Sequence, residues 1–193
     1  MHRQDVYKEI ANLHYKYINQ GFLTSLGIPF LTLLYEAIDA DIDSVLIIEK
    51  VDQVVIGYVA GSSSMRSIYR ELIKRFPRLI FSLVPSFFSP LKIYKILEIL
   101  LFSRQYKLKD TLPDEELLSI VVDQNNRGQG YSDKLFNKLC SYFRARNASG
   151  FRIVVGKSLL KAHSFYIRLG SIPLKEVVVH KGETSVIYLK SLN

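Results

Sequence analysis

Cysteine is scarce in this sequence: Cys140 is the only one among 193 residues. A lone cysteine cannot form an internal disulfide, so we expect a reducing compartment and interpret Cys140 as a small core residue. Long apolar runs are lacking as well, since the longest, residues 79–91, is short for a bilayer span and contains Pro85 and Pro90. The first ten residues lack the apolar core of a signal peptide. These absences predict a cytoplasmic protein without a spanning helix.

Acidic residues are rare in one segment of the chain. Residues 64–109 contain ten Lys and Arg but only two acidic residues, and ten minus two equals the +8 formal charge of the whole chain. The same segment is rich in Ile, Leu, Phe and Tyr, and Pro77, Pro85 and Pro90 are expected to interrupt its helices. We interpret residues 64–110 as a basic helical insertion.

Two interpretations of the insertion remain open. A helix with a basic face and an apolar face can lie on an anionic membrane, so the segment could contact the inner membrane face or a lipid-linked sugar. Alternatively, it is a lid that buries its apolar side on the core and keeps its charges in solvent. A specific nucleic-acid partner is not expected, because no recognition motif accompanies the basic charge. The sequence is compatible with a homodimer but does not specify an oligomeric state.

No metal site is expected from the histidines. His163 and His180 have no cluster of cysteines or carboxylates at ligand spacing. His180 precedes the polar segment KGET, which favours an exposed turn. We interpret His14 and His163 as helix-surface or packing residues.

The remaining composition is that of a globular domain. With 48% hydrophobic and 12% aromatic residues, the chain can bury a full core, and its length indicates one domain over residues 1–193. Apolar periodicity separates helices from strands and predicts a mixed α/β sheet with helices packed on it. The predicted helices cover residues 5–19, 29–39, a segment from the glycine turn to about 150, and 160–169; the predicted strands cover 44–50, 54–62, 116–123, 151–156, 172–180 and 184–190.

The segment DQNNRGQGYSDKLF, residues 123–136, places a glycine-containing turn directly before a helix. Backbone N–H groups at a helix N-terminus and the helix dipole both favour an anion. Gly128 and Gly130 let the backbone approach such a ligand closely, and Arg127 adds a charge with bidentate phosphate geometry. The segment therefore predicts a ligand that carries phosphate.

Two common phosphate motifs do not fit this turn. A P-loop requires Lys followed by Ser or Thr after its last glycine, whereas Gly130 is followed by Tyr131 and Ser132. A dinucleotide fingerprint requires a small third residue where this chain has Asp133, whose charge would repel pyrophosphate.

What remains is RGQGYS, residues 127–132, which resembles the phosphate-turn signature of the GNAT superfamily of N-acetyltransferases: Arg or Gln, two residues, Gly, one residue, then Gly or Ala. Here the last position is Ser132. A second landmark is KAHSFYIRLGSIP, residues 161–173, which looks like the helix that follows the next strand in this family, although Leu159 replaces a frequent asparagine. The resemblance covers most of the chain except the insertion. It implies a GNAT-like fold, with a mixed, mostly antiparallel central sheet flanked by helices.

The resemblance also implies acetyl-CoA as cosubstrate and an amine as acceptor. Acetyl-CoA would lie across the diverging ends of strands 116–122 and 151–156, with its pantetheine on the strand backbone and its pyrophosphate on the turn. The implied cofactor-binding residues are Ile120, Val121, Val122, Arg127, Gly128, Gln129, Gly130, Tyr131, Ser132, Ala162 and Phe165.

Tyr166 is the implied acid for the departing CoA thiolate, because a phenol with an ordinary pKa of about 10 is protonated at neutral pH. The base that deprotonates the amine is left open. Glu115 and Glu116 begin the central strand, where this family often keeps a carboxylate, but charged residues at the start of a strand are commonly only solvated.

The leading interpretation is an acetyl-CoA-dependent N-acetyltransferase for a primary amine. Residues 12–38 also resemble the opening of acyltransferases found with bacterial surface-polysaccharide and sugar-modification pathways, which favours an amino sugar or a sugar-linked intermediate as acceptor. The competing interpretation is a non-catalytic acyl-CoA-binding or peripheral membrane-interaction module.

Overall fold

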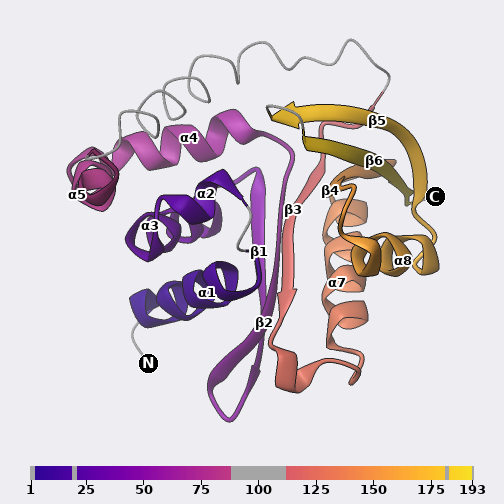
Figure 1. The fold of residues 1–193 in the computed structure, drawn as a ribbon, viewed down its shortest axis with the longest axis horizontal. Helices are drawn as coiled ribbons and strands as arrows, with labels where there is room; N and C mark the ends of the chain where they lie inside the picture. Colours follow the sequence, from indigo (N-terminus) through magenta and orange to yellow (C-terminus); the bar gives the residue numbers. More distant parts are fainter. Residues whose placement is uncertain (1–2, 19–20, 88–111, 181–182, 193) are drawn as a thin grey trace.

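The computed structural model describes residues 3–18, 21–87, 112–180 and 183–192 (Figure 1). One six-stranded sheet, in the order β1-β2-β3-β4-β6-β5, runs through the molecule, and every neighbouring pair is antiparallel except β3 and β4. The strands are β1 (Ser44–Val51), β2 (Val54–Ser62), β3 (Glu116–Val122), β4 (Gly150–Gly156), β5 (Ile172–His180) and β6 (Glu183–Ser191). The predicted mixed, mostly antiparallel sheet is confirmed.

Helices cover both faces of the sheet (Figure 1). One group packs on the first face and the other group on the opposite face, which separates the core into two apolar clusters. The first group is α1 (Arg3–Tyr17), α2 (Phe22–Ser25), α3 (Ile28–Ala40), α4 (Met65–Lys74) and α5 (Phe76–Phe87); the second is α7 (Tyr131–Ala145) and α8 (Leu160–Arg168).

Helix α7 shows how the sequence pattern sets its packing. It buries Leu135, Phe136, Leu139, Cys140 and Phe143, which recur at helical spacing and form one apolar face against the sheet. Burial also raises the pKa of the Cys140 thiol, which keeps it protonated and inert. The interpretation of Cys140 as a core residue is confirmed.

The β1/β2 hairpin forms from the two strands that were predicted over residues 44–50 and 54–62. Asp52 and Gln53 join the two strands, and both have positive φ angles of 49° and 67°. Two consecutive residues in this region match the tight hairpin turn whose twist follows that of the strands.

The helical insertion is described only as far as Phe87, and its remainder to residue 110 lies outside the described residues. Helix α4 ends at Lys74 and α5 begins at Phe76, so the helices are interrupted next to Pro77, as predicted. Pro77 itself stands in the first turn of α5, where its missing N–H would have no helical partner. Helix α5 continues past Pro85, which was expected to break it. The break expected at Pro77 is therefore confirmed, and the break expected at Pro85 is wrong.

Part of the insertion's positive charge is neutralised by helix α3. Arg78 donates to both carboxylate oxygens of Glu36 at 2.8 and 2.7 Å, and Arg75 donates to the same carboxylate at 3.2 Å. These bonds lower the pKa of the Glu36 carboxyl, Arg78 first. The start of the insertion is thus tied to the domain. Among the described residues, no helix has both the length and the apolar character needed to cross a bilayer.

Candidate active site

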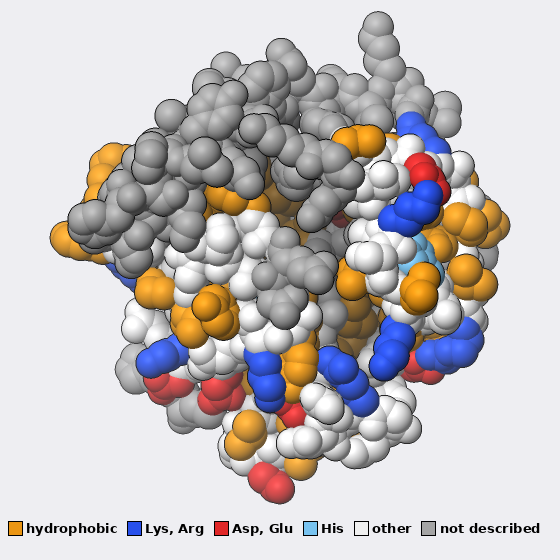
Figure 2. All heavy atoms as spheres, in the orientation of Figure 1, with side chains coloured by type: hydrophobic (Ala, Val, Ile, Leu, Met, Phe, Trp, Pro, Cys, Tyr) orange, Lys and Arg blue, Asp and Glu red, His pale blue; other side chains and the backbone are white. Residues whose placement is uncertain are grey.

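Strands β3 and β4 are parallel but stay paired over a very short length. Their register joins Glu116 to Arg152 and Leu117 to Ile153, and the described residues show no later pair. Because β3 continues to Val122 and β4 to Gly156, the two strands diverge toward their carboxyl ends. The space-filling view shows the surface hollowed between the two halves of the molecule, with apolar side chains in the recess (Figure 2). We call the space between the diverging strand ends the gap.

The direction of the backbone groups on β3 follows from its antiparallel pairing with β2. The Asp123 N–H donates to the Ile56 carbonyl at 2.7 Å, so Asp123 and Val121 turn their backbone groups toward β2. The backbone N–H and C=O groups of Ile120 and Val122 therefore face the gap. Val121 is the exception among the three predicted contacts on β3. Its backbone groups face β2, and its side chain is buried in the cluster beneath α1 and α3.

The turn between β3 and α7 contains the two predicted glycines. Gly128 and Gly130 have φ angles of 78° and 80°, in the left-handed region that favours glycine, and a Cβ on either would meet open space. Gly130 caps α7 without a side-chain hydrogen bond, so the amides of the first turn, which include Tyr131 and Ser132, have no capping side chain. Gln129 bonds back to the turn, donating to a backbone carbonyl at 3.4 Å. The turn therefore offers donors, space and a helix N-terminus together.

Arg127 joins this turn to the strand end and to helix α1. Its Nε donates to the Val122 carbonyl at 3.1 Å, and its guanidinium carbon lies 4.7 Å from the centre of the Tyr17 ring. The Tyr17 hydroxyl donates to Asp123 at 2.9 Å and accepts from the Gln124 N–H at 3.0 Å. The end of α1 is thus fastened to the start of the turn. Sequence reasoning missed Tyr17, because an aromatic residue on an amphipathic helix gives no local signal of a distant partner.

Tyr166 lies in an aromatic cluster beside the gap. Its side chain is only 5% exposed, and its ring contacts those of Phe136, Phe165 and Tyr188 at centroid distances of 6.1, 5.2 and 6.2 Å. Burial raises the pKa of its phenol above the ordinary value, so the hydroxyl stays protonated at neutral pH. No group of the described residues hydrogen-bonds that hydroxyl. Phe165 and the half-buried Ala162 pack on the same cluster.

The two predicted carboxylates stand at the opposite, paired end of β3. Glu116 accepts a hydrogen bond from Arg152 Nε at 2.8 Å, and its charge helps raise the pKa of Tyr69 on α4, after burial as the main cause. The Glu115 backbone carbonyl accepts from the Arg152 N–H at 2.9 Å. Glu116 is therefore ion-paired and faces the helical side of the sheet that carries α4.

Strand β3 carries a polar side chain, Ser119, next to a bulge. Gly61 pairs with Leu117 and Ala60 with Ser119, which leaves Leu118 as an extra residue. The Ser119 hydroxyl then lies 3.2 Å from the buried Tyr35 hydroxyl. Ser119 lies on the same face as Val121, and the bulge turns Leu118 to this face as well, where alternation alone would place it on the other.

The Tyr35 hydroxyl is the centre of a buried network. It lies 2.7 Å from the Tyr58 hydroxyl and 2.5 Å from His14 Nδ1. Burial lowers the pKa of His14 to about 4, so its ring is neutral at neutral pH and can accept from Tyr35. The interpretation of His14 as a packing residue is confirmed, and the network ties α1 and α3 to the centre of the sheet.

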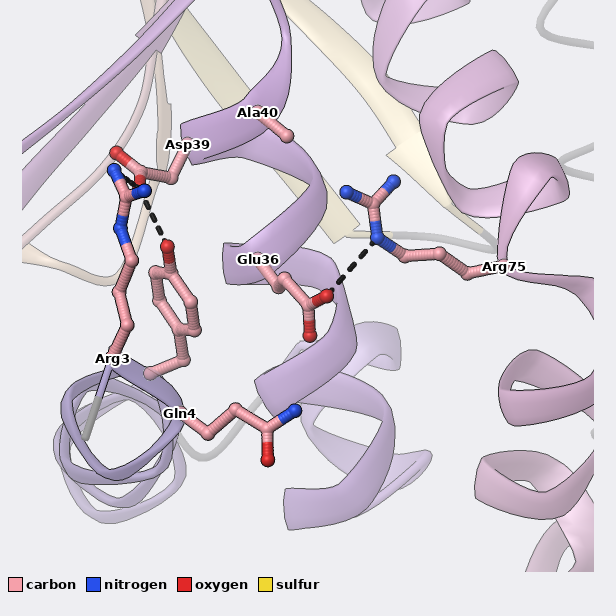
Figure 3. Close-up of a pocket in the computed structure, with 7 residues that line it drawn as sticks. Arg3, Gln4, Glu36, Asp39, Ala40 and Arg75 are labelled. Carbon is pink, nitrogen blue, oxygen red and sulfur yellow. Dashed lines mark hydrogen bonds and ion pairs between the residues drawn. The ribbon is translucent and has the colours of Figure 1, made fainter.

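A separate pocket of about 250 Å³ lies between α1, α3 and the end of α4 (Figure 3). Its polar side chains bind one another, since the Tyr7 hydroxyl donates to Asp39 at 2.6 Å, Arg3 pairs with Asp39 and Arg75 pairs with Glu36. Because these groups are mutually satisfied and distant from the gap in the fold, we do not assign the chemistry to this pocket.

Comparison with known proteins adds independent information. The Acetyltransferase (GNAT) family matches residues 15–170, which is most of the chain. No curated protein is detectably similar in sequence.

Several solved structures share the fold. An N-acetyltransferase from Staphylococcus aureus is 11% identical with a TM-score of 0.63, and the match covers 100% of this chain and 96% of that one. The yncA protein of Salmonella typhimurium, with its cofactor acetyl-CoA, is 11% identical with a TM-score of 0.62, over 100% and 91% of the two chains. A GNAT-family protein from Desulfovibrio desulfuricans is 11% identical with a TM-score of 0.59, over 95% and 92%. The family match and the shared fold agree, and the chain therefore belongs to the acetyltransferase (GNAT) family.

Proposed function

We propose that the acceptor is a primary amine, that acetyl-CoA binds in the gap between β3 and β4, and that Tyr166 is the catalytic acid. The divergence of the two strands carries the proposal, because it leaves the backbone groups of Ile120 and Val122 facing the gap. A ligand with amide groups along its length, such as pantetheine, can pair with these strand groups. Backbone pairing of this kind needs no particular side chain.

The turn that follows β3 suits the phosphate end of the same ligand. The amides of residues 127–132 include the uncapped first turn of α7, and the positive φ angles of Gly128 and Gly130 give an anion close access to them. Arg127 uses Nε on the strand, which leaves its two terminal nitrogens to contact phosphate oxygens. Phosphate on the turn and pantetheine in the gap place the thioester toward the closed end of the gap.

The chemistry is a direct transfer. The amine nitrogen attacks the thioester carbonyl carbon, and backbone N–H groups stabilise the negative charge that develops on the carbonyl oxygen. The carbon–sulfur bond then breaks, and the Tyr166 hydroxyl donates its proton to the departing thiolate. The proton lost by the amine goes to a base, for which Glu116 and Glu115 are the proposed groups. Arg152 Nε donates to the Glu116 carboxylate at 2.8 Å, which orients that carboxylate.

An amino sugar or a sugar-linked intermediate is the acceptor class that we favour. Support comes from the resemblance of residues 12–38, which form the end of α1, α2 and most of α3. These helices cover the face of the sheet toward which Ser119 is directed. Hydroxyl and carboxylate groups on that face fit a polar, amine-bearing acceptor.

A peripheral membrane contact is a second candidate function, supported by the outward side of α4 and α5. Arg66 and Arg70 are exposed on α4. On the same helix and on α5, Ile73, Phe76 and Phe81 are 57%, 58% and 75% exposed, although they are large apolar residues. Basic and apolar side chains exposed together fit an anionic lipid surface.

Substitution of Tyr166 tests the catalytic assignment. We expect Tyr166→Phe to lower turnover on a panel of primary amines by about 100-fold or more, because the thiolate loses its acid. Acetyl-CoA affinity, measured by calorimetry, should stay unchanged, since the ring and its packing remain. The exposed Tyr15 provides a matched control, and Tyr15→Phe should match the wild type. Undiminished turnover in Tyr166→Phe would exclude it as the acid, whereas binding without turnover of any amine by the wild type would favour the non-catalytic alternative.

A further inference from the structure

Both ring nitrogens of His163 have a hydrogen-bond partner, although the sequence indicated only a helix-surface or packing residue. It lies on α8 three residues before Tyr166. Its Nε2 is 3.1 Å from the Gly156 carbonyl oxygen, and its Nδ1 is 2.7 Å from the Tyr188 hydroxyl. A carbonyl can only accept, so Nε2 carries the hydrogen, and in the neutral ring Nδ1 accepts from Tyr188. The two bonds together determine the tautomer and the orientation of the ring.

The carbonyl that His163 binds borders the gap. The Lys157 N–H donates to the Thr184 carbonyl on β6 at 2.9 Å, so Lys157 and alternate residues before it turn their backbone groups toward β6. Val154 and Gly156 therefore turn theirs toward β3, across the gap. The last backbone carbonyl on the β4 side of the opening, that of Gly156, thus accepts from His163 on α8 and also from the Leu159 N–H at 3.0 Å.

Tyr188 links the same histidine to the proposed acid. Its side chain is only 3% exposed, and its ring centroid lies 5.7 Å from that of His163 and 6.2 Å from that of Tyr166. One pair of side chains therefore connects β4, β6 and α8. These are the elements that form the β4 wall of the gap and carry Tyr166.

The opposite wall of the gap has a corresponding arrangement. There, Arg127 Nε binds the Val122 carbonyl at the end of β3. At the open end of the gap, each strand thus has its final carbonyl held by a side chain from a neighbouring segment. Where two neighbouring strands no longer pair with each other, such bonds keep their ends at a fixed place.

We propose that His163, with Tyr188, is a positioning residue for acetyl transfer: it holds the Gly156 end of β4 against α8 and so sets the width of the gap relative to the Tyr166 hydroxyl. This inference rests on the proposed binding of acetyl-CoA in the gap. Its consequence is that the Gly156 bond, rather than the volume of the imidazole, controls the affinity for acetyl-CoA.

Two substitutions of His163 separate its two hydrogen bonds. His163→Gln places an N–H donor near the position of Nε2 and keeps the bond to Gly156. His163→Asn places an acceptor near the position of Nδ1, which keeps Tyr188 bonded and releases Gly156. In calorimetric titrations with acetyl-CoA, we expect His163→Asn to weaken binding by about tenfold and His163→Gln to stay within about threefold of the wild type. Ser164→Ala, on the exposed side of the same helix, is the control and should bind as the wild type does.

The outcomes distinguish this inference from the proposed function. Wild-type affinity in His163→Asn would overturn the inference while leaving the binding site in place, and equal losses in the Asn and Gln variants would overturn it too. A wild type that fails to bind acetyl-CoA would overturn the proposed site and the inference together. Circular dichroism melting checks that each variant is folded. If His163→Asn does not fold, Tyr188→Phe tests the pair through its other bond, and unchanged affinity there would contradict the proposal.

Discussion

At the scale of the residue, His14 shows how burial converts a titratable group into a structural acceptor. Burial lowers its pKa to about 4, against about 6.5 for an exposed histidine. As the pH falls from 7 through 6.5, the unfolded chain binds a proton on His14 that the folded chain excludes until the pH reaches about 4. The stability that the neutral ring contributes is therefore complete above pH 6.5 and decreases between pH 6.5 and 4.

This linkage gives a prediction for His14→Asn, in which the amide oxygen can accept from Tyr35 without titrating. Between pH 7 and pH 5, urea unfolding should show that the wild type loses about 1–2 kcal/mol more stability than the variant, because only the wild type has the titrating ring. All other ionisable groups are shared, so the difference between the two chains isolates His14. Equal losses in both chains would show that the ring does not stay neutral on folding.

At the scale of the element, the start of α7 combines a glycine turn with an uncapped helix N-terminus and Arg127. We expect Arg127→Glu to weaken acetyl-CoA binding at least about tenfold in calorimetric titration, because it puts a negative charge beside the phosphate turn and removes the bond to Val122. Arg146→Glu makes the same change of charge just past the other end of α7 and is the control. If both variants bind like the wild type, the turn is only the entry to a helix.

The elements themselves were largely predictable, and their exceptions have physical causes. The observed bounds of the α7 region, the β1/β2 hairpin and the two C-terminal strands follow the periodicity of their residues. The break expected at Pro85 is wrong, because α5 continues to Phe87. The β3 bulge at Leu118 was also missed, since a bulge depends on how β2 pairs and not on the alternation within β3.

At the scale of the whole molecule, binding to anionic vesicles tests whether the exposed side of α4 and α5 contacts a membrane or belongs to a lid. We expect the protein to cosediment with anionic vesicles of phosphatidylglycerol and phosphatidylcholine at low salt and to be released at high salt. The double variant Arg66→Glu, Arg70→Glu should bind at least about tenfold more weakly, because each basic residue contributes about 1 kcal/mol at such a surface.

The control for the vesicle measurement places the same reversals elsewhere on the surface. Lys8 and Lys50 are exposed on α1 and β1, so Lys8→Glu, Lys50→Glu has the same net charge as the test variant. Equal binding by the two variants would mean that total charge, not α4, governs the interaction. No cosedimentation of the wild type at low salt would remove the membrane interpretation and leave the lid.

The candidate site was predictable to the extent that its residues are neighbours in the chain. The turn residues Arg127, Gly128 and Gly130 were proposed because a turn before a helix is a local pattern. Tyr166 was proposed because its helix resembles a short family motif. His163 was interpreted only as a helix-surface or packing residue, and Tyr188 and Ser119 were not singled out. Their partners lie on other elements, so no spacing in the sequence marks them.

The sequence by itself determined which segments become helices and strands and where a phosphate turn can form, because periodicity, glycine conformation and helix ends act within a few residues. Only the tertiary structure decided that β6 lies between β4 and β5, that β3 and β4 separate after Leu117, and that Tyr17 reaches Asp123 across 106 residues of chain. These features depend on which surfaces pack together once the core forms. Long-range packing of that kind is a property of the assembled sheet and helices, and no single segment contains it.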